Sequence, residues 1–193
     1  MNTSHFYPEL SMVFPQFPNL SFDRALNIAA RTLCRIGLVW RTELEEVEWE
    51  VGEREYFLFL PTNTRCVDVL QLGDLVVTTA QRLAAADPEW LTRVGSPRFY
   101  YRDAANTVAV YPVPGSIAYD PAVPLVALAP MEEGKVLSDD YAWDYERLLL
   151  QGASAHLGVG SWAQFEYECH VARSRATDNN QIGVARAVRY AGY

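Results

Sequence analysis

Histidine and cysteine are the side chains most often used for catalysis or metal binding, and the sequence holds only three of each. His156 falls on the apolar face of one predicted helix and His170 falls on the next helix. A lone histidine on such a face is more often a core residue than a ligand. Cys169 precedes His170, but no Cys-x-x-Cys or His-x-x-x-His spacing accompanies this pair. We therefore predict no metal site.

The sequence also lacks the short motifs that mark nucleophiles and phosphate sites. It contains no Gly-x-Ser-x-Gly elbow, no Walker loop and no Gly-x-Gly-x-x-Gly. The run Gly158-Val-Gly160 is too short to cradle a phosphate and instead predicts a helix break. Asp139 and Asp140 are adjacent, so on a helix they do not face each other, and the favourable dipole at a helix start explains them better. We predict that the chain is not an enzyme and binds no cofactor.

Charge is the polar feature that stands out. The formal net charge is −8, and residues 43–55 alone carry seven Glu and one Arg. Residues 171–193 carry four Arg against Asp178, a local charge of +3, which leaves −11 on residues 1–170. The acidic residues proposed for a contact are Glu45, Glu46, Glu48 and Glu50. The residues proposed to contact a neighbouring subunit or another partner are Arg173, Arg175, Arg186, Arg189, Tyr190 and Tyr193.

Two interpretations of this polarity stay open. One is a solvated acidic hairpin with a frayed basic tail. The other is head-to-tail contact between neighbouring subunits, or docking of the tail on an acidic partner. Because phosphate contacts need clustered Lys and Arg, the acidic balance argues against a broad nucleic-acid-binding surface.

The N-terminal part predicts an arm followed by a helix. Residues 6–20 contain three prolines and five Phe or Leu residues, which favours an extended arm over residues 1–20, laid on the body or on a neighbour. Apolar residues at helical spacing predict a helix over about 23–37, capped by Ser21 or Asp23 and ended by Gly37.

The middle, residues 44–129, has the period of strands. Val47, Trp49 and Val51 alternate with glutamates, which predicts a strand with one apolar and one acidic face. Gly73-Asp74 and the polar residues 103–106 are predicted hairpin turns, and a short helix is expected around 79–86. This region predicts an antiparallel meander of six or seven strands.

Helical period returns over residues 138–176. Ser138 caps the first helix, and the small residues Gly152 and Ala153 allow another helix to approach closely. Ser161-Trp-Ala-Gln164 is a capping box that opens a last helix to about Ala176. The fold predicted is one α+β domain over residues 21–176, with helices at both ends of the chain around a β-rich middle, and a C-terminal docking tail at 177–193.

No run of 18 apolar residues and no basic, apolar leader occurs, so we expect neither a membrane span nor a secretory signal. An odd number of distant cysteines favours a reducing compartment.

An ordered set of segments resembles a known family. These segments are Pro15-Gln-Phe-Pro18, Ala25–Arg35, Val39-Trp40-Arg41, Tyr56–Pro61, Pro88-Glu-Trp90, Gly95–Tyr100, Thr107–Pro114 and Leu150–Leu157. In this order, over roughly residues 13–176, the chain resembles the head-to-tail adaptor (connector) proteins of tailed bacteriophages. The acidic hairpin and the final tail match no motif of that family.

The resemblance implies a structural protein of the virion, made in the host cytoplasm and placed at the head–tail junction. It implies a ring, commonly of twelve copies, that joins the portal protein to the next neck or tail component. Genomic DNA would pass through the axial channel without sequence-specific binding. In such a ring the four glutamates proposed above would face the channel or a neighbouring subunit, and the C-terminal arginines and tyrosines would contact the portal or a neighbour. The alternatives are a stopper or tail-completion protein, a β-rich ligand-binding module of the host, and an unrecognised enzyme.

Overall fold

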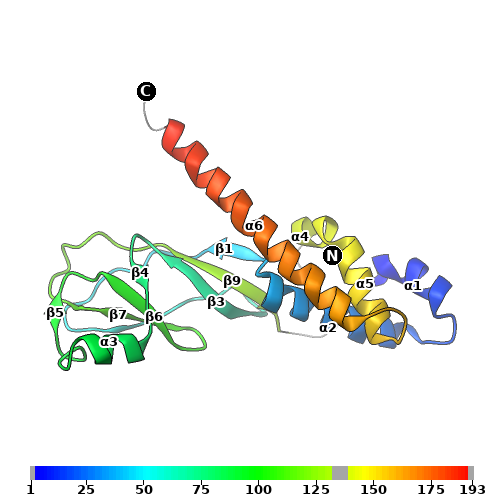
Figure 1. The fold of residues 1–193 in the computed structure, drawn as a ribbon, viewed down its shortest axis with the longest axis horizontal. Helices are drawn as coiled ribbons and strands as arrows, with labels where there is room; N and C mark the ends of the chain where they lie inside the picture. The colour runs from blue at the N-terminus through cyan, green and yellow to red at the C-terminus, as the bar shows by residue number, and fades with distance from the viewer. Residues whose placement is uncertain (1–2, 132–138, 191–193) are drawn as a thin grey trace. The chain divides into compact units, whose positions relative to one another are not determined.

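The computed structural model describes residues 3–131 and 139–190, and for residues 139–140 and 177–190 it describes the backbone alone. The chain divides into two compact units (Figure 1). The first, here called the helical unit, comprises residues 1–40 and 129–193. The second, called the β unit, comprises residues 41–128. The predicted α+β class, with helices towards both ends of the chain, is confirmed.

The helical unit begins with a 3₁₀ turn, Thr3–Phe6, and helix α1, Tyr7–Val13. This helical conformation replaces the extended arm expected for residues 1–20. Pro8 lies in the first turn of α1, where a missing N–H leaves no hydrogen bond unmade. Phe6, Leu10 and Phe14 recur every four residues and are at most 2% exposed, so the apolar side chains are buried in the chain's own core.

Helix α2, Asn19–Gly37, supplies the centre of this core. It begins directly after Pro18 rather than at a Ser21 or Asp23 cap, and Asp23 instead accepts a 2.6 Å hydrogen bond from the Tyr7 hydroxyl. The predicted apolar stripe is confirmed, because Ala25, Ala29 and Leu33 are fully buried.

The C-terminal helices are α4, Asp139–Asp144; α5, Glu146–His156; and α6, Trp162–Tyr190. Helices α2, α5 and α6 pack on one another. A Cβ atom at Gly152 would lie 2.7 Å from the Phe165 ring and 2.8 Å from Ala29 Cβ, so the close approach predicted at Gly152 is confirmed. The Gln164 N–H donates to Ser161 Oγ at 3.3 Å, as the capping box predicts. Ser138 lies outside the described residues.

Helix α6 continues to Tyr190, whereas the sequence predicted its end near Ala176. Asp178, Asn179 and Asn180 are weak helix formers but not breakers, since their backbone N–H groups still donate within the helix. The single Gly183 also leaves the backbone hydrogen bonds in place. Weak propensity alone was therefore a poor signal for a helix end.

Nine strands of the described residues form three small sheets. The first has the order β1-β9-β3, from Arg41–Glu43, Pro124–Pro130 and Thr64–Leu72; the last two residues of β9 belong to the helical unit. The second has the order β2-β7-β6-β4, from Glu55–Phe57, Thr107–Tyr111, Phe99–Ala104 and Val76–Val77. The third pairs β5, Val94–Gly95, with β8, Val113–Pro114. The short helix expected around 79–86 is α3, Ala80–Ala86, capped by Thr79.

The sheets depart from a simple antiparallel meander in two respects. The pairs β4–β6 and β5–β8 are parallel, although the predicted β6–β7 hairpin is confirmed as antiparallel. The hairpin predicted at Gly73-Asp74 is wrong, because β3 and β4 belong to different sheets. Gly73 has φ +51°, and a Cβ there would lie 3.0 Å from Ala122 Cβ, so this glycine turns the chain from one sheet into the other.

Candidate functional site

The four predicted acidic contact residues, Glu45, Glu46, Glu48 and Glu50, lie together on an exposed run of the β unit. The predicted strand over 47–51 is reduced to a single bridge between Val47 and Ala122. The predicted apolar face is confirmed at Val47 and Trp49, which are buried between the exposed glutamates, but is wrong at Val51, which is 62% exposed. The indole N–H of Trp49 donates to the Asp120 carbonyl at 2.7 Å and fixes the run on its inner side.

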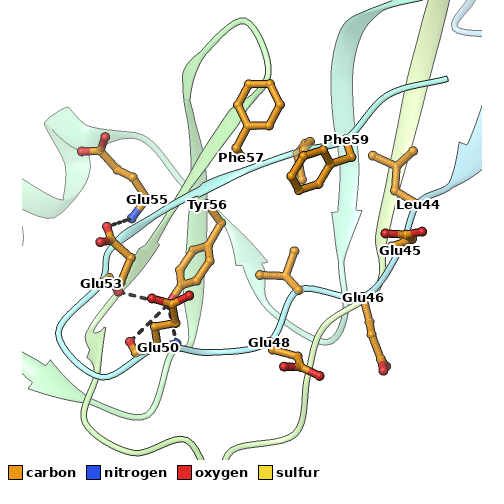
Figure 2. A pocket seen from close by; sticks show the side chains of 12 residues that line it. Leu44, Glu45, Glu46, Glu48, Glu50, Glu53, Glu55, Tyr56, Phe57 and Phe59 are labelled. Carbon is orange, nitrogen blue, oxygen red and sulfur yellow. Dashed lines mark hydrogen bonds between the residues drawn. The ribbon is translucent and has the colours of Figure 1, made fainter. Parts of the chain in front are cut away.

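This acidic run and strand β2 leave the same turn and spread apart, and they line a hollow of about 510 Å³ between them (Figure 2). Tyr56 lies at the base of the turn. Its hydroxyl donates to the Glu53 carbonyl at 3.1 Å and accepts from the Glu50 N–H at 3.2 Å. The Tyr56 ring meets Trp49 edge-on at 5.2 Å between centroids, and burial raises the pKa of its hydroxyl. The turn is therefore a preformed part of the surface.

Few of the carboxylates of the hollow are neutralised by a positive side chain among the described residues. Of its six glutamates, only Glu55 makes an ion pair with a described residue, at 2.6 Å from Arg54. The other five are Glu45, Glu46, Glu48, Glu50 and Glu53. This surface is therefore strongly negative and open to solvent.

Sequence reasoning missed the aromatic part of this surface. Tyr56 and Leu58 point into the protein and are 8% and 2% exposed, whereas Phe57 and Phe59 are 59% and 74% exposed. The two phenylalanine rings meet edge to face, with centroids 5.4 Å apart. Because all four neighbours in Tyr56-Phe-Leu-Phe59 are apolar, the sequence could not indicate which pair faces outward.

The predicted basic contacts lie in the helical unit. Arg173 and Arg175 are exposed on α6. Arg186, Arg189 and Tyr190 fall in the part of α6 described by its backbone alone, and Tyr193 lies outside the described residues. The structure thus gathers the four predicted glutamates into one surface and places the four predicted arginines on one helix, α6.

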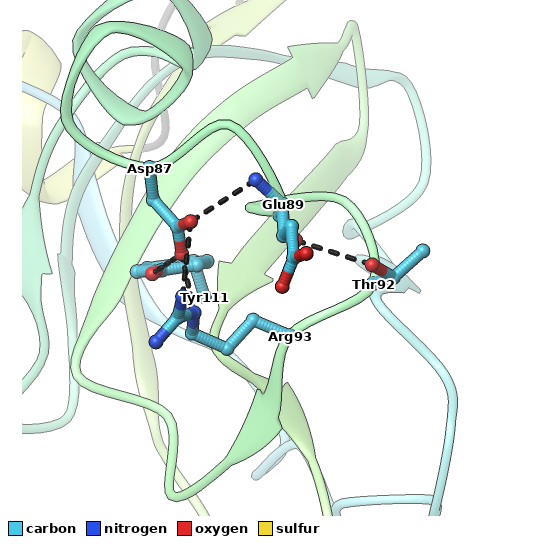
Figure 3. Close-up of polar contacts among 5 residues, drawn as sticks. All are labelled: Asp87, Glu89, Thr92, Arg93 and Tyr111. Atoms are coloured by element: carbon cyan, nitrogen blue, oxygen red, sulfur yellow. Dashed lines mark hydrogen bonds and ion pairs between the residues drawn. The ribbon is translucent and has the colours of Figure 1, made fainter.

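A second polar cluster, also missed from the sequence, surrounds Asp87 at the end of α3 (Figure 3). Asp87 accepts hydrogen bonds from the Tyr111 hydroxyl at 2.6 Å and from the Glu89 N–H at 3.0 Å, and it forms an ion pair with Arg93. The Tyr111 hydrogen bond, together with those from the Glu89 N–H and Arg93, holds the pKa of Asp87 below its usual value. Since all these partners belong to the loop 87–93 and to β7, the cluster braces the loop rather than forming a reaction centre.

The histidines and cysteines give no reaction centre among the residues described. His156 was predicted to be a core residue, but it is exposed in the last turn of α5, with its ring 6.3 Å from that of Trp162. Burial raises the pKa of the Cys169 thiol to about 12, which disfavours the reactive thiolate. No group of three or more His, Cys, Asp or Glu in the described ranges could hold a metal ion.

No helix among the described residues is both long and apolar enough to cross a membrane.

No curated protein matches the chain at a significant level. Residues 9–181 match the sequence profile of the SU10 adaptor protein family, a phage head-to-tail adaptor family. This match covers most of the chain, including both units and the acidic surface. The chain therefore belongs to the SU10 adaptor protein family and is a structural adaptor protein of the phage virion.

Proposed function

We propose that the chain is the repeating subunit of a ring, of twelve copies, that lies beneath the portal and joins the capsid to the next neck or tail component. The family match over residues 9–181 is the observation that carries this proposal, because an adaptor of this family acts with other head and tail proteins of the phage. The ring leaves an axial channel through which genomic DNA passes without sequence-specific binding.

A closed ring needs two different patches on each subunit, because the contact is heterologous and must repeat by rotation. The chain offers two patches of opposite charge. One is the glutamate-lined surface of the β unit, and the other is the part of α6 from residue 171 on, which bears Arg173 and Arg175 and, in sequence, Arg186 and Arg189.

The remaining candidate is another neck protein, of the stopper or tail-completion type. The three packed helices α2, α5 and α6 favour the adaptor over a stopper built only of β-strands. A ring adaptor and a stopper also differ in what they bind first, since only the adaptor contacts the portal directly.

The test is electron microscopy of the full chain mixed with the portal of the same phage. We expect class averages with an added coaxial ring on one face of the portal, with the rotational symmetry of the portal. A portal that remains bare, while the chain binds a separately purified neck component, would contradict the adaptor role and favour the stopper.

A further inference from the structure

The exposed edge of strand β2 is the part of the surface that the adaptor role leaves unexplained. β2 is an edge strand of the four-stranded sheet. Tyr56 pairs with Val108, and hydrogen bonds from the Val110 N–H to the Arg54 carbonyl and from the Leu58 N–H to the Asn106 carbonyl flank this pair. Phe57 lies between these positions, so its N–H and C=O point away from β7.

Beside the charged Glu55, this edge carries an exposed aromatic side chain, which is unusual for an edge left in solvent. Natural sheets protect open edges with charge, proline or a covering segment, because an exposed apolar edge promotes association. Here Phe57 at the end of β2 and Phe59, two residues beyond it, are each more than half exposed, and they line the hollow beside the acidic run. The arrangement is that of a contact surface.

The charge around Phe57 and Phe59 restricts what can cover them. Five of the six glutamates of the hollow have no ion-pair partner among the described residues, so an occupant must bring positive charge. Nucleic acid is disfavoured, because its phosphates would be repelled by this field. The described residues also offer no cluster that could hold a metal ion there. A basic segment of protein with apolar side chains fits best.

The chain itself carries such a segment at the end of α6. With 29 residues, α6 is about 43 Å long, whereas the 19 residues of α2 span about 28 Å and the 11 residues of α5 about 16 Å. The C-terminal part of α6 accordingly extends beyond both helices (Figure 1). In sequence, Arg186, Arg189 and Tyr190 are spaced by three and four residues, a spacing that places them on one side of a helix.

We propose that the hollow lined by Phe57, Phe59 and the glutamates receives the C-terminal part of α6 from a neighbouring copy of this chain. This inference rests on the proposed ring and assigns its heterologous contact to two named patches. The local charges of −6 over residues 43–55 and +3 over residues 171–193 are complementary. Guanidinium groups can form two-pronged hydrogen bonds with carboxylates and can also pack on phenylalanine rings.

Charge reversal on each side, alone and in mixture, tests this contact on the portal. The hollow variant carries Glu46→Lys and Glu48→Lys, and the helix variant carries Arg186→Glu and Arg189→Glu. We expect that each variant alone fails to form the ring on the portal. An equimolar mixture should recover rings of alternating subunits, because every contact in that ring again joins opposite charges. One chain with all four substitutions should also assemble.

The control for the hollow variant is Glu9→Lys with Glu89→Lys, which changes the net charge equally at exposed positions outside the hollow. For the aromatic part, Phe59→Ser should weaken assembly at least tenfold, whereas Ile117→Ser should not, although Ile117 is exposed to the same extent, 75% against 74%.

Three outcomes would overturn the inference. Normal rings from the hollow variant would show that the hollow receives nothing. A four-substitution chain that assembles while the mixture does not would show that each helix contacts its own chain. If the helix variant forms no ring alone, and neither the mixture nor the four-substitution chain forms one, α6 would be assigned to the portal. If wild-type chain forms no ring on the portal, the proposed function fails instead.

Discussion

The two units of the chain are stabilised in different ways. In the helical unit, small residues bring helices into direct contact: Gly152 on α5 lies against both Ala29 on α2 and the ring of Phe165 on α6, and all three are buried. In the β unit, short sheets are tied together by polar side chains that reach backbone carbonyls. Arg102 donates to the carbonyls of Cys66 and Ala105 at 3.0 and 2.8 Å, and also to that of Val67.

The two kinds of stabilisation differ in how much change each contact tolerates. A core closed by helix packing tolerates almost no change at the contact. Large apolar side chains are more than half exposed in both units, among them Met12 and Leu20 in the helical unit and Phe57 and Phe59 in the β unit. We therefore expect folding stability to depend most on the helix contacts, and assembly to depend most on the exposed surface and the end of α6.

The largest effect should come from filling the helix contact. Gly152→Ala should already cost about 1 kcal/mol of unfolding free energy, and Gly152→Leu about 3 kcal/mol, because the added atoms overlap Phe165 and Ala29. Urea unfolding measures both. Gly95→Ala is the matched control in the β unit, since its new Cβ would lie an ordinary 3.5 Å from Pro112. Equal losses at the two glycines would refute the comparison.

A smaller loss of stability is expected from removing a side chain that donates hydrogen bonds to backbone carbonyls. Arg102→Ala should lower the unfolding free energy by about 1–2 kcal/mol, because the carbonyls of Cys66 and Val67 lose a charged donor. Arg98→Ala, next to the same hairpin, is the control, since Arg98 is exposed and uses only its backbone N–H and carbonyl in the contacts described. An unchanged urea midpoint for Arg102→Ala would show that the tie adds no stability.

The Asp87 cluster predicts a pH dependence. The folded-state pKa of Asp87 lies below the ordinary value of 3.8. Unfolded chain therefore binds more protons in this range, so the stabilisation is complete above about pH 4 and is lost as pH falls through the folded pKa. Tyr111→Phe removes the strongest contributor to this shift. Its loss of stability relative to wild type should be present at pH 6 and shrink towards pH 2. A difference that stays constant with pH would argue against the hydrogen bond.

The smallest effect should be on the rate of assembly. Exposed charges steer encounter and are screened by salt, so association with the portal should slow as ionic strength rises from about 0.05 to 0.5 M. Stopped-flow light scattering measures this rate. An association rate that does not change with salt would indicate that apolar contacts such as Phe57 and Phe59, and not the glutamates, control the encounter.

Much of the helical unit could be predicted because its sequence signals are local. The apolar stripe of α2, the small residue Gly152 and the Ser161–Gln164 cap each act within a few residues, and all three are present in the structure. The N-terminal arm was mispredicted because three prolines outweighed the four-residue spacing of Phe6, Leu10 and Phe14.

The β unit was harder to predict because its pairing is not local. Gly73-Asp74 has the composition of a hairpin turn, yet β3 pairs with β9, some fifty residues away, and β4 pairs in parallel with β6. Likewise, the outward direction of Phe57 and Phe59 is set by the pairing of β2 with β7. Alternating glutamates did indicate the acidic surface, but nothing local marked its aromatic side.

The most direct test of the account removes the end of α6 by truncation after Ala176 and measures folding and assembly on the same protein. The described side chains of α6 that are buried, Phe165, Cys169 and Ala172, all remain. We predict an unchanged thermal unfolding midpoint, together with loss of the ring on the portal. A truncated chain that forms the ring normally, or one that unfolds at a markedly lower temperature, would contradict the division between a folded core and an assembling surface.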